Sequence, residues 1–402
     1  MNSEAPPERG GDLCQQRRFG LFLGEWLLIV LFAGIIMLPT LDEIFHLDVS
    51  PVPGENRLLA SVPKVPSLAA PGLRRWSAAW ENYYNDHFGY RKWLIRRFQQ
   101  WKFRLFRDQS GYKVIVGKNH WLYTPEEQSI DHFLGRFRFT PRQLQTWATL
   151  LDKRTDWLAA RGIQYVFVVP PDKQDIYPEN LPDWMLQAAP AHRESKLDQL
   201  LAYLPGHSHT TLLDLRSGLL AAKTNQPVYL QNDTHWNLCG AFLGCQALLQ
   251  TLVLRQPALS PLAAADFPLT NTPVPGGDMA RILGQNTMEP NHYDLLAHPP
   301  LADLQITEIP RFPTAWGIKS VFIAEAQSIK GPNLVLFHDS FAEPWKDFLS
   351  YRFHRVVFEH YSPDFHRELI QTNHPAVVVT EMLERAFNEQ DPEVILQTDG
   401  LP

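Results

Sequence analysis

Short apolar segments alternate with longer amphipathic segments along the chain from about residue 141 onward. These apolar segments are short, and the one at residues 164–169 carries the β-branched run typical of a buried strand. Strands are predicted at residues 164–169, 211–215, 333–337, 355–359 and 376–380. Helices are predicted at residues 141–161, 191–204 and 236–254. Strands that are apolar on both faces and separated by helices indicate an α/β fold whose mostly parallel sheet is covered on both sides.

The longest apolar segment lies near the N-terminus, at residues 19–41. Its 23 residues exceed the roughly 20 that a helix needs to cross the hydrocarbon core of a membrane. Arg17 and Arg18 precede the segment. Because basic residues favour the cytoplasmic side, we expect a cytoplasmic N-terminus and an exported remainder. A cleaved signal peptide and a buried core helix are the alternatives, but no small-residue cleavage pattern follows the segment.

The predicted organisation has four parts: a cytoplasmic tail (1–18), a transmembrane anchor (19–41), a Pro-rich linker (42–75) and a folded domain (76–400). The folded domain begins with a helical stretch at residues 76–107 that is dense in aromatic and basic side chains. This stretch could contact a membrane surface or a glycan, although such helices more often pack on their own domain. Residues 114–123 predict a strand, a turn and a second strand, and residues 255–332 show no clear periodicity.

Composition excludes several classes of protein. The net charge is −6, from 37 Lys and Arg against 43 Asp and Glu. Because nucleic-acid binding requires a basic face, no nucleic-acid partner is expected. The mean hydropathy of −0.24 excludes a protein with many membrane spans. The three cysteines, Cys14, Cys239 and Cys245, show no zinc-binding spacing, and no disulfide is expected.

The first chemical motif is Asp233-Thr234-His235-Trp236. One intervening residue can place Asp233 and His235 on the same side of an extended segment. The carboxylate could then accept a hydrogen bond from imidazole Nδ1 and stabilise the imidazolium that forms during proton transfer. A surface turn or a helix N-cap is the common alternative for such a triplet.

The second motif, His338-Asp339-Ser340-Phe341, follows the predicted strand at 333–337. A serine just beyond the carboxyl end of a central strand is where α/β enzymes expose a nucleophile. A helix is expected to begin near Glu343, and free amides at that turn could stabilise an oxyanion. The alternative is that Asp339 or Ser340 only caps this helix.

Together the two motifs supply a nucleophile, a base and an orienting carboxylate. A metal site is the competing use of the four side chains of Asp233, His235, His338 and Asp339. The sequence contains no paired-histidine helix motif and no cysteine set that would favour this use. These residues imply no dissociable cofactor.

The chain resembles the alginate O-acetyltransferase family (AlgX/AlgJ-like), whose members have an SGNH-hydrolase-like domain. The resemblance runs with gaps from about residue 55 to residue 387, and the core match is Tyr229, the Asp233–Trp236 motif and Gly240. The other matching positions are residues 55–58, 86–91, 117–118, 121–123, 170–173, 177–179, 277–279, 339–341 and 375–385. The resemblance implies a three-layer α/β/α fold preceded by the transmembrane helix.

The resemblance also implies roles for individual residues. In the family, the aspartate and histidine of the first motif and the serine of the second form a triad, which here corresponds to Asp233, His235 and Ser340. His338 is a departure, because better-known members carry a small residue there; it could crowd the site or shift the nucleophile turn. The glycine and asparagine oxyanion donors of ordinary SGNH hydrolases have no evident counterpart. The residues expected to line a substrate site are Lys173, Tyr229, Arg281 and Asp339.

The activity implied by the resemblance is O-acetyl transfer to an exported polysaccharide. The protein would be a single-pass protein of the inner membrane with its catalytic domain in the periplasm. The expected partners are a polysaccharide acceptor and an acetyl donor that a multispanning membrane acyltransferase supplies. One alternative is an acetyl esterase that uses the same triad. Another is a non-catalytic polysaccharide-binding assembly subunit, which would explain the anchor and the aromatic stretch but not the triad.

Overall fold

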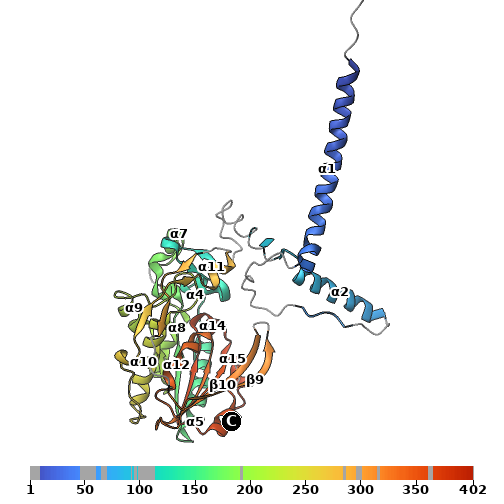
Figure 1. The fold of residues 1–402 in the computed structure, drawn as a ribbon. Coiled ribbons are helices and arrows are strands. Elements are labelled where there is room, and N and C mark those ends of the chain that lie inside the picture. Colours follow the sequence, from blue (N-terminus) through green and yellow to red (C-terminus); the bar gives the residue numbers. More distant parts are fainter. Residues whose placement is uncertain are drawn as a thin grey trace, which may run out of the picture. The chain divides into compact units, whose positions relative to one another are not determined.

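The computed structural model describes most of the chain: residues 10–45, 60–64, 70–91, 93–94, 97, 114–190, 193–283, 287–295, 301–314, 317–360 and 365–401. The chain divides into two compact units, Met1–Lys102 and Phe103–Pro402. Each unit is described separately below (Figure 1).

The first unit contains two helices, α1 (Gly10–Phe45) and α2 (Ala70–His87). α1 includes Glu25–Asp42, a stretch that is long and apolar enough to cross a membrane and that fits an anchor or a signal sequence. α1 extends beyond the predicted segment 19–41 at both ends, and α2 begins inside the predicted linker 42–75. A turn at Gly89 and Tyr90, where Tyr90 has a positive φ of 58°, interrupts the helix predicted at 76–107.

The second unit is built on a seven-stranded sheet with the order β4-β3-β13-β11-β12-β10-β9. The first five strands in this order pair in parallel, and β10 and β9 add antiparallel strands at one edge. The strands are β3 (Gln164–Val169), β4 (Leu212–Asp214), β9 (Gln305–Thr314), β10 (Gly317–Glu325), β11 (Asn333–His338), β12 (Arg355–His360) and β13 (Val377–Glu381). The prediction of an α/β fold with a mostly parallel sheet is therefore confirmed.

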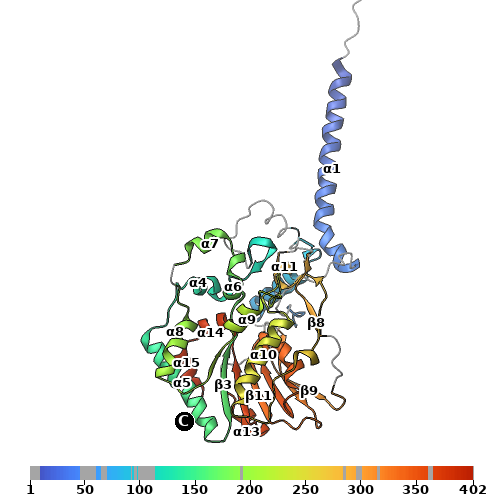
Figure 2. The ribbon, with the colours of Figure 1, turned by 90° about the vertical axis from the view of Figure 1, so that its left-hand side faces the viewer.

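Alternate residues of the central strands face two separate hydrophobic cores. Val166, Leu336 and Val379 belong to one core, and Phe167, Val335 and Val378 belong to the other. The first core packs against α9 (Arg216–Ala222), α10 (Leu238–Val253) and α12 (Lys346–Leu349). The second packs against α5 (Pro141–Ala159), α8 (Lys196–Tyr203), α13 (Arg367–Asn373), α14 (Glu384–Glu389) and α15 (Pro392–Thr398). Helices therefore cover both faces of the sheet, with α10 and α5 visible in Figure 2.

Local sequence signals explain where the main helices begin. Thr140 and Gln143 form a capping box at the start of α5, and Pro141 occupies its first position. The Asn237 side chain accepts a hydrogen bond from the Gly240 amide and caps α10. The helical turn after β11 starts at Ser340 instead of near Glu343, because the Asp339 carboxylate caps it.

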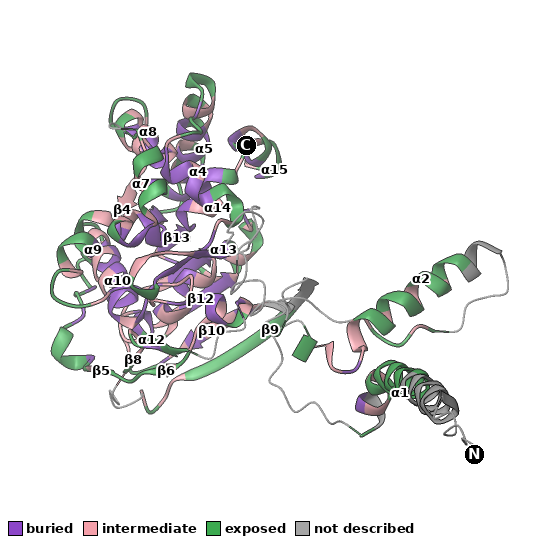
Figure 3. Ribbon diagram, turned by 90° about the horizontal axis from the view of Figure 1, so that it is seen from above, coloured by how far each residue is buried: buried purple, intermediate pink, exposed green. Residues whose placement is uncertain are grey.

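Smaller elements surround the carboxyl edge of the sheet. They include the pairs β1 (Ile115–Val116) with β2 (Leu122–Tyr123), β5 (Leu269–Asn271) with β8 (Tyr293–Leu295), and β6 (Val274–Pro275) with β7 (Met288–Glu289). The short helices are α4 (Ser129–Phe133), α6 (Lys173–Ile176), α7 (Asp183–Ala188) and α11 (Asp278–Ile282). The central strands are buried, whereas β9 presents an exposed edge in Figure 3.

Candidate active site

The turn that carries Ser340 lies directly after β11, which has parallel neighbours on both sides. Ser340 follows Asp339 and begins the short 3₁₀ helix η6 (Ser340–Trp345). The Asp339 carboxylate accepts hydrogen bonds from the amides of Phe341 (2.9 Å) and Leu383 (2.7 Å). The first bond caps η6, and the second joins the turn to the segment after β13. Both bonds hold Ser340 at the carboxyl edge of the sheet.

Asp233 and His235 lie on a tight loop just before α10. An isolated β-bridge between Tyr229 and Trp236 closes this loop. The Trp236 indole Nε1 donates a hydrogen bond to the backbone carbonyl oxygen of Phe341 at 2.8 Å. Because Phe341 directly follows Ser340, this bond ties the loop to the serine turn, although the two segments are far apart in the sequence.

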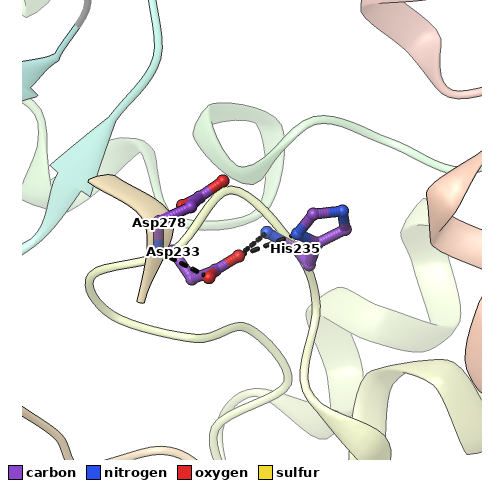
Figure 4. A group of neighbouring side chains, drawn as sticks. All are labelled: Asp233, His235 and Asp278. Carbon is purple, nitrogen blue, oxygen red and sulfur yellow. Dashed lines mark hydrogen bonds and ion pairs between the residues drawn. The ribbon is translucent and has the colours of Figure 1, made fainter. Parts of the chain in front are cut away.

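The three side chains form a continuous hydrogen-bonded series. His235 Nδ1 lies 2.8 Å from Asp233 Oδ1 (Figure 4), and His235 Nε2 lies 2.9 Å from Ser340 Oγ. When the ring proton is on Nδ1, the Nδ1–H group donates a hydrogen bond to the Asp233 carboxylate. Nε2 then has a free lone pair and can accept a hydrogen bond from the serine hydroxyl. Both distances lie in the range required of a nucleophile and its base.

The electrostatics of the series favour a charged Asp233 and a basic His235. Burial by itself would raise the pKa of Asp233, but the hydrogen bond and charge of His235 outweigh it and hold the pKa well below its usual range. Burial would lower the pKa of His235, but the hydrogen bond and charge of Asp233 outweigh that effect and raise it. Asp233 therefore stabilises the imidazolium that proton transfer would create.

Asp278, at the start of α11, fixes Asp233 from the other side. Its backbone amide donates to Asp233 Oδ2 at 2.9 Å, and its carboxylate accepts from the Thr234 amide (3.0 Å) and hydroxyl (2.9 Å). Burial and the neighbouring charge of Asp233 raise the pKa of Asp278. A Cβ atom at Gly277 would lie 2.4 Å from Cβ of Asp233, so this close approach requires glycine.

The hydrogen bonds made by the nearby carboxylates and imidazole argue against the alternative of a metal site. Asp233, His235 and Asp278 place ligand atoms within 4.8 Å of one another (Figure 4). However, the Asp233 carboxylate is hydrogen-bonded to His235 and to the Asp278 amide, and the Asp278 carboxylate is hydrogen-bonded to Thr234. His338 and Asp339, the other two residues of the competing proposal, do not belong to this group.

Lys173 and Tyr229 support the loop that carries Asp233. Lys173 is buried at the start of α6, and its ammonium group donates to the backbone carbonyl oxygens of Leu230 (3.0 Å), Gln231 (3.3 Å) and Asp233 (2.5 Å). Burial lowers the pKa of Lys173 to about 7. Tyr229 is fully buried, and its hydroxyl donates to the carbonyl oxygen of Pro171 at 2.5 Å. Both side chains therefore face backbone, whereas the sequence suggested that they line a substrate site.

Two further residues were expected to bind substrate. The Asp339 carboxylate is occupied by the amide of Phe341 in the serine turn and by the amide of Leu383 after β13. Arg281 is exposed on α11, and its role in substrate binding stays a prediction.

His338 neither crowds the serine nor displaces its turn. Its side chain is 1% exposed, and its ring lies 5.8 Å from that of Phe358 in an edge-on arrangement. Nδ1 lies 2.6 Å from the carbonyl oxygen of Asp339. Burial lowers the pKa of His338, so the ring is neutral at pH 7.

Two supporting residues were not recognised from the sequence. The buried carboxylate of Glu289 accepts from the amides of Gln231 (2.8 Å) and Asn232 (2.7 Å) and so braces the Asp233 loop. Arg385 pairs with Asp172 at 2.7 Å, and its charge opposes protonation of His235. Arg385 falls within a stretch that carried the family resemblance, whereas no pattern marked Glu289.

A serine at the carboxyl edge of a parallel sheet, hydrogen-bonded to a histidine that an aspartate orients, is the arrangement of a serine-dependent hydrolase or acyltransferase. The match to a protein family agrees with this class. Residues 114–299 match the family model described as an SGNH hydrolase-like domain, acetyltransferase AlgX. Asp233 and His235 lie within the matched range, and Ser340 lies beyond it.

Similar proteins include two described as probable alginate O-acetylase AlgJ. The protein from Pseudomonas syringae pv. tomato is 28% identical over 46% of this chain and 44% of its own length. The protein from Pseudomonas fluorescens has the same identity and coverage, so the matches span less than half of each relative. Among solved structures, Bacillus cereus PatB1 with a sulfonyl adduct covers 70% of this chain and 98% of its own, with 15% identity and a TM-score of 0.49. The resemblance to AlgX/AlgJ-like proteins is confirmed.

Proposed function

We propose that the chain is a membrane-anchored O-acetyltransferase that acetylates hydroxyl groups of an exported polysaccharide. The observation that carries the proposal is the 2.9 Å approach of His235 Nε2 to Ser340 Oγ at the carboxyl edge of the sheet. The similarity to an acetyltransferase family and to alginate O-acetylases supports acetyl as the transferred group and a polysaccharide as the acceptor.

In the first half-reaction, Ser340 Oγ attacks the carbonyl carbon of an acetyl donor. His235 Nε2 takes the hydroxyl proton as the new C–O bond forms, and Asp233 stabilises the imidazolium. The tetrahedral intermediate then collapses, the bond between the carbonyl carbon and the donor's leaving group breaks, and His235 returns the proton to that leaving group. The product is an acetyl ester on Ser340.

In the second half-reaction, a sugar hydroxyl replaces the departed group. His235 Nε2 removes its proton while the sugar oxygen attacks the acetyl carbon. Collapse breaks the ester bond to Ser340, whose oxygen recovers the proton from His235. If water enters in place of the sugar, the same steps hydrolyse the donor, and the protein acts as an esterase.

The negative charge of each tetrahedral intermediate needs hydrogen-bond donors. The Phe341 amide is occupied by Asp339. We assign the developing oxyanion to the backbone amide of Ser340, the first amide of η6.

The proposed setting is the inner membrane, with α1 as a single-pass anchor and the catalytic unit on the periplasmic side. A multispanning acyltransferase would deliver the acetyl group across the membrane. The apolar stretch Glu25–Asp42 and the alginate O-acetylase relatives support this setting.

The test is incubation of the full-length protein in nanodiscs with an activated acetyl ester, with and without oligosaccharide acceptors. Transfer predicts acetylated oligosaccharide and a rate of donor consumption that rises with acceptor concentration. Release of free acetate alone, unaffected by any acceptor, would identify an esterase. No consumption of ester by wild type or the Ser340→Ala variant would favour the non-catalytic assembly role.

A further inference from the structure

The second helix of the first unit, α2, has one side formed by aromatic rings. Trp76, Trp80, Tyr83 and Tyr84, here called the aromatic stripe, recur at the three- and four-residue spacing that places side chains on one face of a helix. Neighbouring rings touch: the centroids of Trp76 and Trp80 are 6.1 Å apart, and those of Trp80 and Tyr83 are 5.6 Å apart. The opposite face carries small and polar residues, Arg75, Ala78, Asn82 and Asn85.

Two members of the aromatic stripe are exposed within the described part of the first unit, and Trp76 and Tyr83 are half-buried. Trp80 is 40% exposed and Tyr84 is 53% exposed, and most of α2 is marked as exposed in Figure 3. Trp and Tyr, which combine an apolar ring with a polar N–H or O–H group, are the residues enriched where a membrane meets water. A stripe that packed in a protein core would more commonly consist of Leu, Ile and Val.

The position of α2 is set by contacts with the end of the candidate membrane span. Just after α2, a Cβ atom at Gly89 would lie 2.0 Å from the carbonyl oxygen of Pro39, so the backbones meet directly. The next amide, that of Tyr90, donates to Asp42 Oδ2 at 2.8 Å. Asp42 is the last residue of the span Glu25–Asp42. The C-terminal end of α2 therefore lies at the level where the span leaves the hydrocarbon.

The sequence that follows α2 is positively charged and would attract anionic phospholipid. Residues 91–107 contain seven Lys and Arg and no Asp or Glu, interspersed with five aromatic residues. In the described part of this stretch, the Arg97 guanidinium lies 5.5 Å from the ring centroid of Trp93. Basic residues close to a bilayer are attracted to anionic lipid headgroups.

We propose that α2 lies along the outer surface of the membrane, with the aromatic stripe in the lipid headgroup region and Asn82 and Asn85 facing water. The partner is anionic phospholipid. The inference rests on the proposed membrane anchoring and is independent of the triad. A surface helix of this kind would limit the distance of the following chain from the bilayer.

The test uses variants of the full-length protein with one accessible cysteine each, labelled with an environment-sensitive fluorophore and reconstituted in nanodiscs that contain phosphatidylglycerol and spin-labelled lipid. Cys14 is replaced by serine, and the buried Cys239 and Cys245 are left in place because they are inaccessible to the label. Labels are placed at Y84C in the stripe and, as the matched control, at N85C on the opposite face. G34C, where added atoms meet open space, reports the span itself.

The proposal predicts strong quenching at G34C, intermediate quenching at Y84C and several-fold weaker quenching at N85C. Quenching at G34C with none at Y84C would overturn it and indicate a helix that packs on protein or binds glycan. Equal quenching at Y84C and N85C would also overturn it, because the helix would lack the proposed orientation. Absence of quenching at G34C would contradict both the proposed membrane anchor and the proposed position of α2. Ester consumption in the same nanodiscs separates these outcomes from a failure of the proposed chemistry.

Discussion

At the scale of single residues, the basicity of His235 results from opposing effects. Burial and the nearby guanidinium of Arg385 disfavour the imidazolium, whereas the hydrogen bond and charge of Asp233 favour it. The effects of Asp233 are the larger ones, so the pKa of His235 lies above its usual value. A base of this kind is ready to accept the Ser340 proton but is lost to protonation at mildly acidic pH.

The pH dependence of the reaction follows from this shift. Because only the neutral imidazole can act as base, the rate should fall as the pH drops through the raised pKa of His235. The midpoint of this fall should lie above the unperturbed value of about 6.5. Turnover of a chemically stable acetyl ester, measured from pH 4.5 to pH 9, gives the profile. A flat profile, or a midpoint well below the unperturbed value, would argue against His235 as the base.

Replacement of the orienting carboxylate should separate chemistry from stability. Asp233→Asn keeps the size of the side chain but no longer stabilises the imidazolium, and the rate should fall by about 10³- to 10⁴-fold. The midpoint of the pH profile should also move lower, because the negative charge that raises the pKa of His235 is gone. Turnover and thermal unfolding are measured on the same preparation. A variant with near wild-type turnover would exclude Asp233 from the triad.

At the scale of elements, the site depends on a loop with little regular structure of its own. Backbone groups of residues 230–233 receive hydrogen bonds from Lys173 of α6 and donate them to Glu289 of β7. The loop is therefore held between two elements that lie far apart in the sequence, and its shape depends on side chains outside it.

Loss of the Lys173 ammonium should loosen this loop. Lys173→Met keeps the aliphatic stem but removes the ammonium donor from the carbonyl oxygens of Leu230 and Asp233, whereas Gln231 O keeps its bond from the Leu122 amide. The expected cost is about 1–3 kcal/mol in the free energy of unfolding. Turnover should fall further than this loss of stability explains, because Asp233 shifts relative to His235. Lys196→Met is the matched control, since Lys196 also donates to a backbone carbonyl, that of Asn388, away from the triad. Equal effects of the two substitutions on turnover would assign Lys173 a purely structural role.

Some elements could be predicted from sequence because their signals are local. The β-branched runs of β3 and β13, the apolar run of β11 and the capping residues of α5 mark those elements within a few positions. The antiparallel strands β9 and β10 were not predicted, because β9 is an exposed edge strand with prolines and lacks a continuous apolar run.

The same distinction applies to the site. Asp233, His235 and Ser340 occur in compact motifs at element boundaries, so their grouping could be predicted, and their catalytic role stays a proposal. The partners of Lys173, Tyr229 and Glu289 are backbone groups, and a sequence does not show which backbone atoms a side chain will reach. The backbone contacts of Lys173 and Tyr229 could therefore not be predicted, and the role of these side chains in substrate binding stays a prediction.

At the scale of the whole molecule, the described hydrophobic core belongs to one of the two units. All residues of its three clusters lie between Val114 and Ile395, inside the second unit. Proteins with their own core are expected to fold independently. The first unit would then provide attachment to the membrane without contributing to the stability of the second.

A fragment comprising residues 103–402 should therefore fold alone. We expect a cooperative thermal transition, resistance to limited proteolysis and retention of ester turnover, because both motifs of the triad lie within the fragment. Circular dichroism and proteolysis measure the first two properties. An aggregated or protease-sensitive fragment would show that residues 1–102 complete the fold.

The most direct test of the proposed chemistry is the location of the acetyl group during turnover. The full-length protein is exposed briefly to an activated acetyl ester, quenched in acid, digested and analysed by mass spectrometry. A gain of one acetyl group on Ser340, absent from the Ser340→Ala variant, is the predicted result. The alanine variant should lose turnover and retain its fold, because the Asp339 carboxylate and not the Ser340 side chain caps η6. An acetyl group on another residue, or full turnover by the alanine variant, would contradict the proposed role of Ser340.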